Sequence, residues 1–91
     1  MILTGGYVPA LKMIVLYIDN RHLKDILRSY CHELVHHNQN LENSDYIRRI
    51  FSYSDSLVDS PEMEEVEADA FLRGNILFRK FTEWFKNQQK H

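Results

Sequence analysis

The chain has 91 residues, a net charge of −2 and a composition that is 44% hydrophobic and 26% charged. This balance is typical of one soluble globular domain. The basic residues do not cluster in the sequence as they do in proteins that bind nucleic acids. The longest apolar run, residues 13–18, is far too short to cross a membrane.

The single cysteine, Cys31, excludes an internal disulfide and fits a reducing compartment, so we expect a cytoplasmic protein. The N-terminus lacks the charged and apolar regions of a secretion signal. The chain enters its first predicted strand almost at once, which is compatible with residues 1–91 being the C-terminal part of a longer protein. A domain of this size often needs a staple such as a metal ion.

The first predicted element is a strand over residues 12–18, where a short, continuous run of β-branched and aromatic residues indicates burial on both faces. Residues before it can form a small partner strand around Gly5 and Gly6, with Pro9 limiting how far the pairing extends.

A helix is predicted from about His22 to Leu41, with Asp19 or Asn20 as a candidate N-cap. Leu23, Ile26, Leu27, Tyr30 and Leu34 recur at intervals of three and four residues and form its apolar stripe.

Two further helices follow in the sequence. Ser44 can cap a short helix over residues 44–53, which a loop at 54–60 ends. Ser60 and Pro61 then mark the start of a last helix that runs to about Lys86. Gly74 lies inside this helix and indicates a close helix contact or a bend.

The pentad HELVH, residues 32–36, carries the chemistry of the predicted first helix. Two histidines four residues apart, His32 and His36, direct their rings to one point, where neutral imidazole nitrogen can bind zinc. Glu33 then stands beside the water that such a metal holds and can accept its proton as a general base. His37 and Cys31 are rotated away from this face; we interpret His37 as a packing or substrate-side group and Cys31 as a small buried hydrophobic residue.

Acidic residues at the start of the last helix supply candidates for a third ligand. The first of them suit the helix dipole, but the acids in residues 65–69 stand among small and apolar residues. Glu65 and Asp69 are four apart and share a face, so Glu65 can bind zinc while Asp69 accepts the second N–H of a ligand histidine.

The pentad followed by E-x-x-A-D at 65–69 resembles the two motifs of gluzincin metallopeptidases. The same pair is similar to the catalytic cores of the ImmA/IrrE-type domains and of the heat-shock and prenyl-protein proteases. The resemblance implies Zn²⁺ bound by His32, His36 and Glu65, with Glu33 as the general base. It also implies that Asp69 orients a ligand histidine, taken to be His32.

We therefore expect an α+β, helix-dominated fold over residues 1–91: a single zincin-like catalytic domain with a short strand or hairpin, an active-site helix and a glutamate helix. The expected function is that of a zinc metalloendopeptidase acting on a peptide or protein substrate, with no nucleic-acid or membrane partner. The substrate is expected to pair with the edge of the strand at 12–18.

The oxyanion-stabilising residue stays open among four candidates chosen by residue type: Tyr46, Tyr53, His37 and Arg73. The alternative function is a regulatory or interaction domain with a structural zinc, for which Glu33 would have no use. A third alternative is a metal-free helical protein whose aromatic last helix packs on a partner.

Overall fold

The computed structural model describes residues 4–53 and 60–88. Its elements in chain order are β1 (Gly5–Val8), a 3-10 turn (Pro9–Leu11), β2 (Met13–Leu16), α1 (Leu23–Glu42), α2 (Ser44–Tyr53) and α3 (Pro61–Gln88). The predicted helix-dominated α+β fold is confirmed. The predicted loop at 54–60 lies, except for Ser60, outside the described residues.

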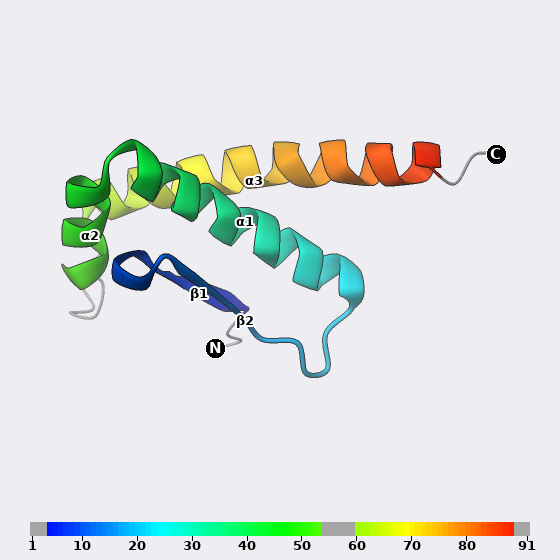
Figure 1. Cartoon of the computed structure of the whole chain (residues 1–91), viewed down its shortest axis with the longest axis horizontal. Helices are drawn as coiled ribbons and strands as arrows, with labels where there is room; N and C mark the ends of the chain where they lie inside the picture. Colours follow the sequence, from blue (N-terminus) through cyan, green and yellow to red (C-terminus); the bar gives the residue numbers. More distant parts are fainter. Residues whose placement is uncertain (1–3, 54–59, 89–91) are drawn as a thin grey trace.

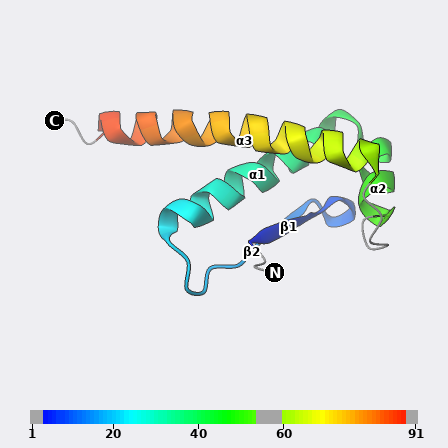
Figure 2. The same ribbon diagram turned by 180° about the vertical axis from the view of Figure 1, so that it is seen from behind.

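Helix α1 is the central element of the fold (Figure 1). Helix α3 lies along one side of α1, and the hairpin of β1 and β2 lies along the other side. Helix α2 closes the end at which α1 and the N-terminal half of α3 meet, and Figure 2 shows the same order from behind. Side chains that project from the two faces of α1 can therefore meet either α3 or the hairpin.

The hairpin is a two-stranded antiparallel sheet in which Gly5 pairs with Leu16 and Val8 with Met13. Its turn contains Pro9 and ends at Lys12, which adopts the left-handed conformation (φ 50°). A side chain at Gly5 would place its Cβ 2.6 Å from the Val15 carbonyl oxygen, so the pairing requires glycine there.

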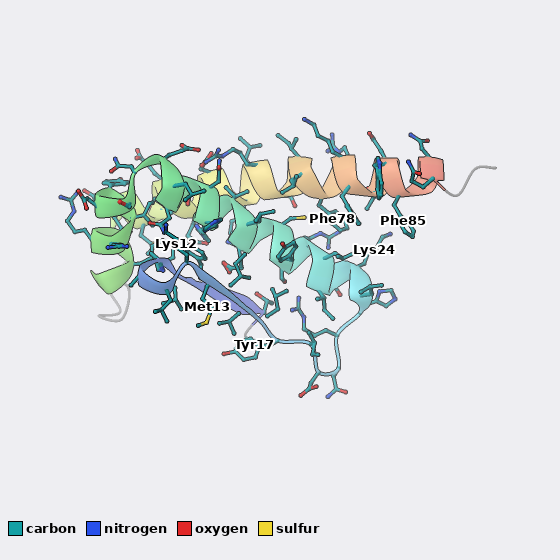
Figure 3. The ribbon with its side chains drawn as sticks, viewed as in Figure 1. Lys12, Met13, Tyr17, Lys24, Phe78 and Phe85 are labelled. Atoms are coloured by element: carbon teal, nitrogen blue, oxygen red, sulfur yellow. The ribbon has the colours of Figure 1, made fainter. Side chains whose placement is uncertain are left out.

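The strand at 12–18 is shorter than predicted, and the prediction that both its faces are covered is wrong. Met13 is 43% exposed and Tyr17 is 47% exposed. Figure 3 shows both side chains pointing away from α1. Because the sheet has only two described strands, α1 covers one of its faces and no described element covers the other.

Helix α1 starts later than the predicted caps. His22 is its N-cap, and its Nδ1 accepts a hydrogen bond from the Lys24 backbone N–H. Asn20 instead has a positive φ of 57° in the turn that precedes the helix, so it cannot serve as the cap.

The predicted cap of the last helix is confirmed, because the Ser60 hydroxyl accepts a hydrogen bond from the Met63 backbone N–H at 3.1 Å. A small core lies between α2 and α3. It consists of Ile47, Ile50 and Val66, with Met63 and two aromatic rings packed against it.

Helices α1 and α3 are in close contact at Gly74. A Cβ at this position would lie 3.1 Å from the His32 Cα, a contact between two backbones. Gly74 thus marks a helix contact, one of the two alternatives that the sequence left open. None of the helices in the described part of the chain has the length and apolar character needed to span a membrane.

Candidate metal centre

Three side chains from two helices meet where α1 faces α3. His32 and His36 project from α1, and Glu67 projects from α3 between them. The Glu67 carboxylate lies 3.2 Å from the His32 Nε2 and 2.9 Å from the His36 Nε2. His36 is almost fully buried, whereas the Glu67 side chain is 39% exposed. The cluster is therefore anchored in the core and open on one side.

The separations of Glu67 from the two histidines are close to those between neighbouring ligands of a tetrahedral metal ion. Zinc binds imidazole nitrogen and carboxylate oxygen at about 2.0–2.2 Å, which separates neighbouring ligand atoms by roughly 3.3 Å. One ligand atom from each of the three residues can be chosen so that all lie within 4.8 Å of one another. Two imidazoles and one carboxylate would leave a fourth position for water or substrate.

The structure differs from the sequence prediction at the third ligand. Glu65 is exposed, and Glu67 takes the place beside the histidines that was assigned to it. Residues two positions apart on a helix point in directions that differ by about 200°, so Glu65 and Glu67 cannot both face α1. Ala70 and Gly74 follow Glu67 at three and seven residues; Ala70 is buried, and Gly74 makes a close contact with α1. The helix therefore turns Glu67 inward and Glu65 outward.

Glu33 lies beside the cluster but is not part of it. Its carboxylate oxygen is 4.0 Å from the His36 Nε2, beyond hydrogen-bonding distance. The side chain is buried, and this burial raises the pKa of Glu33 above its ordinary value, against the lowering effect of His36 and His32. Glu33 thus sits where the sequence placed it, next to the two histidines.

The charges at the centre are strongly coupled. Hydrogen bonds from His32 and His36 lower the pKa of Glu67 to about 2. Burial alone would lower the pKa of His36, but its hydrogen bonds with Glu67 and Gln39 raise that pKa above the ordinary value. The carboxylate at the centre is therefore ionised throughout the physiological range.

The prediction that Asp69 orients His32 is wrong, because the His32 Nδ1 has no hydrogen-bond partner among the described residues. Asp69 accepts hydrogen bonds from Arg73 and from the Gln39 Nε2, and the Arg73 guanidinium holds the pKa of Asp69 below its ordinary value. Gln39 in turn bonds the His36 Nδ1 at 2.8 Å. Asp69 therefore reaches the other histidine of the pair, and only through Gln39.

The two histidines differ in how their second nitrogen is held. The His36 Nδ1 has Gln39 as its partner, whereas the His32 Nδ1 is buried without a hydrogen-bond partner among the residues that the structure describes. Packing takes the place of that hydrogen bond at His32, whose ring lies 4.5 Å from the Phe71 ring, between ring centroids.

The other residues singled out in the sequence lie away from the centre. The His37 Nδ1 is 2.6 Å from the Tyr7 hydroxyl, and Arg73 is engaged by Asp69 and Glu42. Tyr46 packs against the core of α2 and α3. The side chain of Tyr53 lies outside the described set. Cys31 is a buried free thiol, as predicted, and burial raises its pKa.

A cavity of about 800 Å³ opens in front of the cluster. The two histidines, Glu33 and Glu67 line it, together with side chains from every helix and residues 4–7 around β1. Phe51, Met63 and Phe71 give it an apolar wall beside the Glu33 and Glu67 carboxylates, while Arg21 and Arg28 lie towards the start of α1. The cavity is large enough for a peptide segment.

The strand that borders this cavity is β1. Residues of β2 do not line it, so the strand at 12–18 is not the one next to the centre. Tyr17 N–H donates to the Thr4 carbonyl, which makes these two residues a hydrogen-bonded pair. Because such pairs alternate along antiparallel strands, Gly5 and Tyr7 point their backbone groups away from β2.

Sequence reasoning missed Glu67 and Gln39. The spacing of Glu67 with Ala70 and Gly74 carried the signal for the glutamate, because small residues at three and seven positions mark the face that meets another helix. Gln39 follows His36 by three residues and so shares its face. Comparisons with protein-family models, with curated proteins and with solved structures find no match to this chain.

Proposed function

We propose that the chain is a zinc-dependent metallopeptidase of the gluzincin type, in which His32, His36 and Glu67 hold the metal. The observation that carries the proposal is the convergence of these three side chains beside Glu33 in one open cavity. Bound zinc would lower the pKa of a water molecule and polarise a substrate carbonyl. A cytoplasmic location remains part of the proposal and rests on the single cysteine.

Glu33 is the general base in this proposal. Its carboxylate is close to the cluster yet outside direct contact with the His36 Nε2, at 4.0 Å. That distance leaves it free to accept a proton from water in the cavity and to deliver the proton to the leaving amine. Glu33 is buried, which limits the conformations that its side chain can adopt.

The edge of β1 is the proposed binding surface for the substrate backbone. The backbone groups of Gly5 and Tyr7 that face away from β2 are available to an added antiparallel strand. Among the described residues no strand occupies this edge. The apolar side chains Phe71 and Met63 lie in the same cavity and favour an apolar side chain near the scissile bond.

The test is hydrolysis of a casein or mixed-peptide substrate by the zinc-loaded chain, compared with Glu33→Gln. The variant keeps the shape of the side chain and removes the base, so activity should fall about 10²–10⁴-fold while zinc affinity changes by less than about twofold. Glu65→Gln is the matched control, because it makes the same change at an exposed position outside the cluster.

Activity that survives Glu33→Gln would rule out Glu33 as the base. A wild-type chain that binds zinc tightly but hydrolyses no substrate would instead favour the alternative of a structural zinc in a regulatory or interaction domain.

A further inference from the structure

The side-chain amide of Gln39 makes three hydrogen bonds to described residues in one largely buried network. Its Oε1 lies 2.8 Å from the His36 Nδ1, and its Nε2 donates to the Val66 carbonyl at 3.1 Å and to the Asp69 Oδ2 at 2.9 Å. The side chain is 7% exposed. It therefore links the histidine on α1 to both backbone and side chain of α3.

The partners of Gln39 determine which way its amide points. A backbone carbonyl and an ionised carboxylate can only accept hydrogen bonds, so the amide nitrogen must face Val66 and Asp69. The amide oxygen then faces His36 and can only accept. The proton of that hydrogen bond therefore belongs to the His36 Nδ1.

Asp69 is itself fixed, which prevents the amide from turning. Arg73 approaches it with three contacts, from Nε at 3.1 and 3.0 Å and from a terminal nitrogen at 2.6 Å. The bidentate guanidinium holds the carboxylate in place on the same helix. The chain of hydrogen bonds runs from Arg73 through Asp69 and Gln39 to His36.

From this geometry we propose that Gln39 is a positioning residue that keeps a proton on the His36 Nδ1 and leaves Nε2, which faces Glu67 at 2.9 Å, as the nitrogen that binds the metal. The inference rests on the proposed metal centre and adds a residue that neither motif contains. It also makes the two ligands unequal, because His32 lacks such a partner among the described residues. Partners of this kind orient a ligand ring and increase its basicity.

The experiment combines zinc titration against a chromophoric chelator with ¹H–¹⁵N correlation spectra of the histidine rings. In the wild-type chain, both zinc-loaded and metal-free, His36 should carry a proton on Nδ1, and in the loaded chain it should bind zinc through Nε2. Gln39→Leu removes the acceptor at similar volume. It should weaken zinc binding about 10–100-fold and increase solvent exchange of the Nδ1 proton.

Two further variants make the result specific. Gln39→Glu retains an oxygen acceptor and should preserve the Nδ1 proton that Gln39→Leu exposes, although it loses the hydrogen bonds that the amide donates to Val66 and Asp69. Asn38→Leu is the matched control, because Asn38 is the exposed neighbouring amide and bonds only Glu42 in this region. It should leave zinc affinity within about twofold of the wild type. The wild-type spectra test the proposal even if Gln39→Leu fails to fold.

The possible failures are distinguishable. Zinc bound through the His36 Nδ1, or an affinity that Gln39→Leu does not change, would overturn the positioning role and leave the metal centre standing. A chain that shows the Nδ1 proton but takes up no zinc would overturn the proposed function, while the hydrogen bond would remain.

Discussion

Glu65 and Glu67 are the same residue type on the same helix, two positions apart, and only one of them faces α1. Glu67→Ala should abolish tight zinc binding, because it removes one of three protein ligands and leaves two histidines alone. Glu65→Ala should leave zinc affinity within about twofold of the wild type. Competitive titration of both variants measures the difference, and the reverse pattern would restore the assignment made from the E-x-x-A-D motif.

At this scale the sequence predicted the residue types better than their partners. The pair His32 and His36 follows from spacing on a single helix, which is local information. The identity of the third ligand depends on which face of α3 meets α1. That face is marked by the buried Ala70 and by Gly74, which packs against α1, a segment distant in sequence. The E-x-x-A-D motif does not contain this information, and it therefore selected Glu65, which faces away from α1.

Helix α3 is held against α1 at the level of the metal centre by Gly74, whose missing side chain allows the close approach to His32. Gly74→Val should separate the two helices and destabilise the chain by about 1–3 kcal/mol. Valine has a slightly better helix propensity than glycine, so the loss cannot arise from the helix itself. Thermal unfolding should show a midpoint about 4–8 °C lower for each kcal/mol lost.

Zinc affinity should fall in Gly74→Val as well, because Glu67 moves with α3 away from both histidines. Ala68→Val introduces the same side chain at an exposed position on the same helix and serves as the control. A Gly74→Val chain as stable and as tight in zinc binding as the wild type would show that the helix contact tolerates the added volume.

The bounds of the elements were well predicted, since all three helices lie within a few residues of their predicted ranges. The apolar stripe predicted for the first helix is wrong, because Leu23 and Tyr30 are exposed. The buried face of α1 carries Cys31, Val35 and His36 instead.

Less was predictable where tertiary contacts decide. The exposure of β2 depends on the number of strands in the sheet and on the elements that cover it. A continuous apolar run in the sequence does not determine either of these. His22 is the N-cap of α1 because Asn20 adopts a positive φ in the turn that precedes the helix.

The whole molecule is small, and the hydrophobic cluster between α2 and α3 has three buried members among the described residues. Large apolar side chains on α3 remain exposed, among them Phe71, Trp84 and Phe85, and Figure 3 shows Phe85 on a part of α3 beyond Phe78. A chain with so limited a core has a stability of only a few kcal/mol, so ligand binding can contribute a large share of it.

Metal removal should therefore lower the stability of the chain markedly. A free zinc concentration about 1,000 times the dissociation constant stabilises the folded state by about 4 kcal/mol. For a domain of this size the unfolding midpoint should rise by roughly 15 °C or more when zinc replaces a chelator. Calorimetry or circular dichroism measures the shift, and Glu67→Ala should lack it. An equal midpoint with and without zinc would mean that the native state does not bind the metal selectively.

The division of the metal centre between two helices has a consequence for the order of folding. His32 and His36 come together as soon as α1 forms, whereas Glu67 is 35 residues from His32 in sequence and arrives only when α3 docks. In the proposed metal centre, the chain would offer zinc a two-nitrogen site before docking and a three-ligand site after it. The transition from weak to tight metal capture would thus coincide with the docking of α3 on α1, and the rate of zinc uptake would follow the rate of that docking.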